Sequence, residues 1–275
     1  MVTSSLADDI NLIAAWLSKE ELADIGSFGV FDCVVLCGSQ LLQQATALFR
    51  ALEGSPSLTK VMVITGGIGH STSGLYEAVS KHPIYYVLSE EIKGLPESRV
   101  FERILRRFFD LEKITSKGCK LLIEDRSTNC GSNAIETLRL LEASGISRPQ
   151  SCAIIQDPTM MRRTVAGFEK VSNESTNKAF GESINTNFVA CPVFVPQMVT
   201  DGHDLDFCVP NVEAKELWSK ERFYELLSGE IPRLRDDSGG YGPAGKDFIV
   251  HVDIPMEVES AASRLQQALG SSRSM

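Results

Sequence analysis

Four apolar runs of this chain each stop at a short polar segment, most of them containing glycine, that leads into a helical pattern. The runs and their endings are Val34–Ser39, Val61–Thr72, Leu121–Asn129 and Ala153–Thr159. Strands that alternate with helices form a mostly parallel sheet, so the carboxyl ends of these four runs should meet at one edge. Ligands of open α/β sheets bind in the crevice beyond that edge. The pattern therefore predicts a ligand site built from four strand ends.

The same alternation predicts one Rossmann-like α/β domain over residues 1–275, with a mostly parallel sheet, helices on both faces and a C-terminal extension. Residues 195–247 are interpreted as a lid or C-terminal excursion within that domain. Strands are expected at 31–37, 60–65, 84–88, 120–124, 152–156, 188–194 and 247–252. Helices are expected at 7–24, 41–52, 73–80, 97–110, from 129 onward, around 160–168, at 213–228 and at 257–269. Residues 172–187, rich in Ser, Asn and Thr, are expected to form a loop.

Composition narrows the class of protein. The chain is 43% hydrophobic and 23% charged, as ordinary globular proteins are. Its net charge of -9 argues against a nucleic-acid partner, because phosphate binding usually shows as a basic face. No apolar stretch approaches the roughly 20 residues of a membrane span, and no secretory signal is apparent. The 7 cysteines form no CxxC pair, which is typical of reduced thiols in a cytoplasmic protein and does not suggest zinc.

The segment after the second strand is the most site-like. It runs Gly66-Gly67-Ile68-Gly69-His70-Ser71-Thr72. Its glycines allow positive φ and let a ligand approach the backbone N–H groups. A serine or threonine at its end would cap the next helix, whose N-terminus favours an anion. The imidazole is a weak candidate for a catalytic group, and a tight strand-to-helix turn is the plain alternative. On the ligand interpretation, Gly67→Val should abolish binding with little loss of fold.

Two carboxylates and several short polar side chains follow the strand at 120–124. The candidate residues are Glu124, Asp125, Ser127, Thr128, Asn129 and Asn133. A carboxylate at a strand end suits a ribose diol, a metal or a cationic ligand group, and Glu124 is a weak catalytic candidate. The alternative is helix capping by Ser127 or Asn129 beside a solvated acidic pair. Cys130 is interpreted as structural.

The strand at 152–156 ends in a third polar segment. Its candidate residues are Gln156, Asp157, Pro158, Thr159, Met160, Arg162 and Arg163. Arginines in the first turns of a helix oppose the helix dipole. That placement indicates a bidentate grip on a carboxylate or phosphate, with surface solvation as the alternative. Arg235 and Tyr241 belong to a polar, glycine-rich segment that would close the crevice from the C-terminal side, unless it is a solvated loop.

Together these motifs resemble the SanA/ElyC/YdcF family of bacterial unknown-function domains, and its YdcF-like members most. The matching stretches are Gly66–Thr72, Ile123–Asn129 with Cys130-Gly131 and Asn133-Ala134, Gln156–Met160 with Arg162–Thr164, and Pro232–Tyr241 continuing to Asp247–Asp253. The resemblance implies a Rossmann-like fold that binds S-adenosylmethionine.

Three positions bear on how closely the family pattern is kept. Glu97 matches the family's acidic position in the helix before the Ile123 strand. Ser132 stands where the family usually has glutamate, which weakens an inference of metal binding or acid–base chemistry there. Ser39, after Gly38, replaces a family asparagine, so one hydrogen bond of the pocket differs.

The hypothesis from the sequence is a cytoplasmic protein that binds S-adenosylmethionine or a related nucleoside, with no metal cofactor. Its small-molecule ligand is the expected partner, with no membrane partner, and homo-oligomerisation is left open. The simplest reaction is methyl transfer, although only Cys37-Gly38-Ser39 stands where methyltransferases carry their glycine motif. The alternatives are a non-catalytic nucleotide-responsive binder, and a metal-assisted hydrolase of a phosphorylated or glycosylated metabolite that uses Glu97, Glu124 or Asp157.

Overall fold

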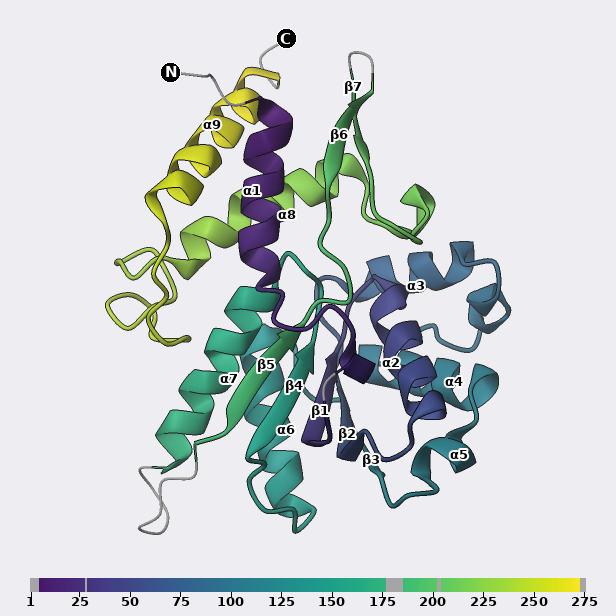
Figure 1. Ribbon diagram of the computed structural model, residues 1–275. Coiled ribbons are helices and arrows are strands. Elements are labelled where there is room, and N and C mark those ends of the chain that lie inside the picture. Colours follow the sequence, from purple (N-terminus) through teal and green to yellow (C-terminus); the bar gives the residue numbers. More distant parts are fainter. Residues whose placement is uncertain (1–4, 28, 177–184, 202–203, 273–275) are drawn as a thin grey trace.

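The computed structural model describes residues 5–27, 29–176, 185–201 and 204–272. Within them, five parallel strands form the central sheet in the order β3-β2-β1-β4-β5 (Figure 1). They are β1 (Phe31–Cys37), β2 (Thr59–Thr65), β3 (Lys120–Glu124), β4 (Ser151–Ile155) and β5 (Asn187–Cys191). The chain order reverses between β1 and β4, which is the switch point where doubly wound sheets bind ligands. The Rossmann-like α/β fold is confirmed.

Helices cover both faces of the sheet. On one face lie α2 (Leu42–Gly54), α3 (Thr72–Lys81), α4 (Glu97–Phe108) and α5 (Leu111–Thr115), and on the other α6 (Cys130–Ala143) and α7 (Met161–Thr176). Side chains alternate along a strand, so Val34 and Leu36 of β1 join the first core while Val35 and Cys37 join the second. Burial on both faces explains why these strands are continuous apolar runs in the sequence.

A third hydrophobic cluster lies at one end of the sheet, where Figure 1 groups α1, α8, α9 and a hairpin. Its elements are α1 (Leu6–Ser18), β6 (Met198–Asp201), β7 (Asp204–Phe207), α8 (Lys220–Leu234) and α9 (Met256–Ser272). The 195–247 excursion therefore contains the β6–β7 hairpin, the 3-10 turn η3 (Ala214–Glu216) and α8. No helix in the described ranges is long and apolar enough to cross a membrane.

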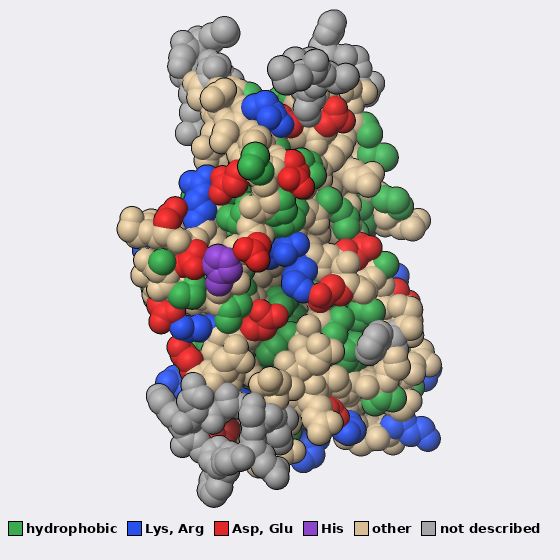
Figure 2. Space-filling view, turned by 60° about the vertical axis from the view of Figure 1, so that its left-hand side comes forward, with side chains coloured by type: hydrophobic (Ala, Val, Ile, Leu, Met, Phe, Trp, Pro, Cys, Tyr) green, Lys and Arg blue, Asp and Glu red, His purple; other side chains and the backbone are tan. Residues whose placement is uncertain are grey.

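Charges of both signs are mixed on the face of the molecule that Figure 2 shows. Among the side chains coloured there, lysines and arginines lie beside aspartates and glutamates rather than in one continuous basic patch. Oppositely charged side chains also form ion pairs, for example Lys170 with Asp247 and Arg235 with Glu259. Pairs of this kind on a surface contribute little to stability, because water screens them.

Two predicted strands are wrong. Residues 84–88 include the 3-10 helix η2 (Tyr85–Leu88), since Nδ1 of His82 accepts hydrogen bonds from the backbone N–H groups of Ile84 and Tyr85. A side chain that captures backbone donors competes with strand pairing. Residues 247–252 form no strand: the N–H of Phe248 donates to the Tyr241 carbonyl, and that of Val250 donates to Ala166 in α7.

Other boundaries shift without changing the fold. The first helix ends at Ser18, where Lys19 takes a left-handed conformation with φ of 43°, so it does not continue to 24. The helix predicted from 213 starts at Lys220, where Ser219 accepts a hydrogen bond from the backbone N–H of Arg222 and caps it. The loop predicted at 172–187 lies partly outside the described residues, and α7 continues to Thr176.

Candidate functional site

A small cavity of about 50 Å³ opens at the carboxyl edge of the sheet. It is lined by Gly38, Gly66, Gly67, Gly69, Ser71, Glu97, Ser127, Thr128, Asn129, Cys130, Asn133 and Met160. The lining comes from the segments that follow β1, β2, β3 and β4 and from the start of α4. All of these residues except Cys130 were predicted from the sequence as ligand contacts. The position of Cys130 directly after Asn129, a predicted cap of the next helix, was the signal that could have identified it. The four strand ends therefore meet as the pattern predicts.

Glu97 is the acidic group of this cavity. Its Oε1 accepts hydrogen bonds from the hydroxyls of Ser71 at 3.1 Å and Thr72 at 3.0 Å. Its Oε2 faces Gly38, where a Cβ atom would lie only 2.0 Å away. Burial raises the pKa of the Glu97 carboxyl, against the opposing effect of those two hydroxyls. The side chain is thus held by one oxygen, and no described residue donates a hydrogen bond to the other.

Those two hydroxyls do not cap α3 as the sequence suggested. Ser71 is the N-cap residue, but its side chain makes no capping bond. The Thr72 hydroxyl accepts from the backbone N–H of Gly69 at 2.8 Å while it donates to Glu97. The end of the glycine segment is therefore organised around the carboxylate rather than around the helix terminus.

The glycine segment is clamped from two sides. The N–H of Gly67 donates to the Ser127 hydroxyl at 3.2 Å, and the carbonyls of Gly66 and Gly67 accept from the N–H groups of Ser98 and Glu97 at 2.8 and 3.1 Å. Gly66 has a φ of 149°, a conformation that side chains rarely adopt. The segment is therefore fixed between the start of α4 and the turn after β3 by the chain itself.

Gly67→Val is expected to destabilise the fold, which reverses the expectation from the sequence. A Cβ atom at this position would lie 2.1 Å from the Ser127 carbonyl oxygen and 2.9 Å from that of Asp125. We expect a loss of roughly 1–3 kcal/mol or more in the free energy of unfolding, measured in urea. Gly54→Ala is the control, since a Cβ there meets nothing within 4 Å. Wild-type stability of the Gly67→Val variant would contradict the clamp.

Glu124 serves the turn rather than the cavity. Its Oε2 accepts from the hydroxyls of Thr65 and Ser127, both at 2.6 Å, and its Oε1 accepts from the N–H groups of Arg126 and Ser127 at 2.6 and 2.9 Å. Asp125 turns away and pairs with Arg99 at 2.8 Å. The two carboxylates therefore shape and anchor the loop that supplies Ser127 to the cavity.

The start of α6 follows the capping interpretation. Oδ1 of Asn129 accepts from the Ser132 N–H at 3.0 Å, and the Ser132 hydroxyl accepts from the N–H groups of Thr128 and Asn129. Ser132, at the position where the resembling family has glutamate, is thus used in a capping box. Beside it, the Cys130 sulfur lies 3.9 Å from that of Met160, and both residues line the cavity. This wall of the cavity is therefore rich in sulfur.

Several predicted residues lie outside the cavity. Gln156, Asp157, Pro158 and Thr159 are buried in the turn after β4. Both oxygens of Asp157 are used there: Oδ1 accepts from the N–H and hydroxyl of Thr159, and Oδ2 accepts from the Trp218 indole at 2.9 Å. Ser39 is buried and accepts from the Leu41 N–H. His70 is exposed and does not line the cavity.

The predicted arginines bind the chain itself. Arg162 donates to the Trp16 carbonyl at 2.7 Å and stacks on its ring, with 4.2 Å from guanidinium carbon to centroid. Arg163 forms a bidentate pair with Glu230, with N–O distances of 2.5 and 3.0 Å.

The C-terminal candidates also lie away from the cavity. Arg235 pairs with Glu259 of α9. Tyr241 packs against Phe248 with 5.3 Å between ring centroids. Like the two arginines of α7, these residues hold the helices and loops of the third cluster together.

One observation on metals and one comparison with known families complete the description of the site. Among the described residues, no group of three or more His, Cys, Asp or Glu side chains is placed to hold a metal ion. A comparison of the chain with models of known protein families finds no match. The resemblance to the SanA/ElyC/YdcF family therefore stays a prediction from the motifs.

Proposed function

We propose that this chain is a YdcF-like protein that binds S-adenosylmethionine, or a related nucleoside, at the carboxyl-edge cavity. The observation that carries the proposal is the Glu97 carboxylate, which is buried, held by two hydroxyls and has Oε2 turned toward the glycine backbone. Such an acceptor suits a ligand ammonium or ribose hydroxyl, because a hydrogen bond to a charged group is stronger than one between neutral groups. The motif resemblance points to the same ligand.

The size of the cavity limits how much of the ligand it takes. Pockets for drug-sized ligands usually measure about 300–1,000 Å³, whereas this cavity is about 50 Å³. One end group would therefore enter beside Glu97, and the rest of the molecule would extend past the exposed Thr128 and Asn129. In that pose the N-terminal turn of α6 and the Met160 side chain border the ligand.

Glu97→Gln is expected to weaken S-adenosylmethionine binding by about tenfold or more, because the amide keeps the shape and loses the charge. Isothermal titration calorimetry measures the affinity, and thermal melting checks that the variant is folded. Asp125→Asn is the matched control, because its carboxylate pairs with Arg99 outside the cavity. Failure of the wild-type protein to bind at millimolar concentration, or equal affinity in the Glu97→Gln variant, would overturn the proposal.

Whether the ligand reacts is a separate question. The metal-assisted hydrolase has less support, because donors of the chain itself occupy the carboxylates of Glu124 and Asp157. Methyl transfer to a small molecule and non-catalytic binding require the same cavity. Incubation with methyl-labelled cofactor and a metabolite extract separates them, since only the transferase gives a labelled product.

A further inference from the structure

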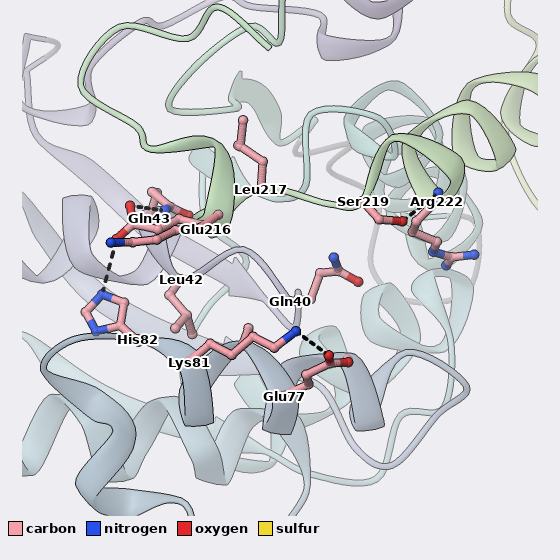
Figure 3. A pocket seen from close by; sticks show the side chains of 13 residues that line it. Gln40, Leu42, Gln43, Glu77, Lys81, His82, Glu216, Leu217, Ser219 and Arg222 are labelled. Carbon is pink, nitrogen blue, oxygen red and sulfur yellow. Dashed lines mark hydrogen bonds and ion pairs between the residues drawn. The ribbon is translucent and has the colours of Figure 1, made fainter. Parts of the chain in front are cut away.

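A larger cavity, of about 240 Å³, lies between the start of α2, α3 and residues 215–222 (Figure 3). The turn after β1 separates it from the candidate site, with Gly38 lining the smaller cavity and Gln40 the larger one. Leu42, Ala78 and Leu217 give it apolar walls. The two cavities share no lining residue.

One end of this cavity holds an unfilled donor, the Nε2 of His82, beside the amide of Gln43. Nε2 of Gln43 donates to Glu216 at 2.9 Å, and its Oε1 is buried out of reach of the cavity. His82 uses Nδ1 to accept two backbone N–H groups, so the neutral ring carries its proton on Nε2. That nitrogen lies 4.0 Å from Glu216, beyond direct hydrogen-bond distance. A ligand hydroxyl can therefore accept a hydrogen bond from Nε2 of His82.

Burial lowers the pKa of His82, with Glu216 acting in the opposite sense and Lys215 in the same one. The ring is thus held as a neutral donor and acceptor. Tyr85 stacks on it with 4.0 Å between centroids, and the Tyr85 hydroxyl is hydrogen-bonded to Thr46. The inner end of the cavity is therefore rigid and pre-arranged.

The rim of the cavity carries cations from three separate elements: Lys81 of α3, Lys215 of η3 and Arg222 of α8. They pair with Glu77 at 2.5 Å, Glu213 at 2.7 Å and Glu225 at 3.6 Å. These pairs are exposed to water, and exposed pairs are weak enough for a ligand anion to compete. In Figure 3, Lys81 and Arg222 extend on the other side of the cavity from Gln43 and His82.

We propose that this cavity binds a small phosphorylated polyol, of the sugar-phosphate class. Lys81 and Arg222 hold the phosphate, and a hydroxyl of the ligand accepts a hydrogen bond from Nε2 of His82. Arginine and lysine are the usual partners of phosphate groups. Glu77 and Glu216 also line the cavity and oppose an anion, so the three cations of the rim must outweigh them.

The test is isothermal titration calorimetry with glucose 6-phosphate, glucose and inorganic phosphate as probes. We expect saturable binding of glucose 6-phosphate and affinities at least about tenfold weaker for either fragment. Lys81→Ala/Arg222→Ala should weaken both phosphate-containing probes about tenfold or more. His82→Phe should weaken glucose 6-phosphate alone, because it removes the inner donor and keeps an aromatic ring, and thermal melting checks that this variant is folded. Lys93→Ala is the control, an exposed lysine paired with Glu90 away from the cavity.

Three outcomes would overturn this assignment. One is absence of saturable glucose 6-phosphate binding at millimolar concentration, and another is equal affinity for inorganic phosphate, which would mark an unspecific anion patch. The third is a loss of S-adenosylmethionine binding in Lys81→Ala/Arg222→Ala, which would give this cavity to the nucleoside. The double variant replaces exposed side chains, so its fold is expected to persist. An unchanged S-adenosylmethionine affinity in this double variant would show that the two cavities bind their ligands independently.

Discussion

Removing either partner of the ion pair between Arg163 and Glu230 is expected to destabilise the folded chain by about 3–5 kcal/mol. Glu230 is 1% exposed, and the guanidinium grips it through two nitrogens at 2.5 and 3.0 Å. A buried charge that loses its partner keeps its desolvation cost and loses the attraction that offset it. Arg233 also donates to Glu230 at 3.0 Å, but it is half-exposed and cannot replace the bidentate contact.

Urea denaturation of Arg163→Met, Glu230→Met and the double variant measures this effect. The double variant should lose far less than the sum of the two single losses, because two methionines of similar length leave no unpaired charge. Arg235→Met is the control: its pair with Glu259 is about one-third exposed, so we expect a loss within about 1 kcal/mol. Single variants that cost no more than this control, or losses that simply add, would show that the buried pair is not coupled.

The fold and most of the cavity could be predicted because both follow from local patterns. Two-sided burial makes β1 and β2 continuous apolar runs, and parallel pairing brings Gly38, Gly66 and Ser127 to one edge. This prediction does not depend on which side chains, distant in the sequence, contact one another. The strands predicted at 84–88 and 247–252 from apolar residues alone were wrong. There, His82 and the Tyr241 carbonyl accept hydrogen bonds from backbone groups that a strand would use.

The roles of the polar groups after β4 were not predictable in the same way, because their partners are far away in sequence. Arg162 meets Trp16 across 146 positions, Arg163 meets Glu230 across 67, and Asp157 meets Trp218 across 61. An arginine at a helix start indicates an anion nearby, and that inference from the dipole was sound. The anion is Glu230 of the chain itself, and nothing local to Arg163 distinguishes it from a ligand.

Asp157 is expected to make the chain less stable at neutral pH than at mildly acidic pH. Burial raises its pKa from 3.8 to about 6, against the hydrogen bonds from Thr159 and Trp218 and with a contribution from Glu230. Since the folded chain binds this proton more tightly than the unfolded one, the stabilisation is complete below the unfolded value of 3.8 and is lost as the pH rises through about 6. The whole loss, reached near pH 7, is about 3 kcal/mol.

Asp157→Asn isolates this contribution, because the amide keeps the shape and cannot ionise. The free energy of unfolding is measured in urea from about pH 4 to about pH 7 for both proteins, and the difference cancels the titration of other groups. The variant should gain about 2–3 kcal/mol relative to wild type across this range. The difference in unfolding free energy between the two proteins at low pH, where the Asp157 carboxyl is protonated, measures the effect of losing the oxygen that accepts from the Trp218 indole.

Asp32→Asn gives the matched control, since it too removes a carboxylate that accepts backbone hydrogen bonds. The Lys60 side chain lowers the pKa of Asp32, so its stabilisation is present above 3.8 and is lost only in stronger acid. Its difference from wild type should therefore stay flat between about pH 5 and about pH 7. A flat curve for Asp157→Asn as well would mean that Thr159 and Trp218 outweigh burial and keep the Asp157 carboxylate ionised throughout.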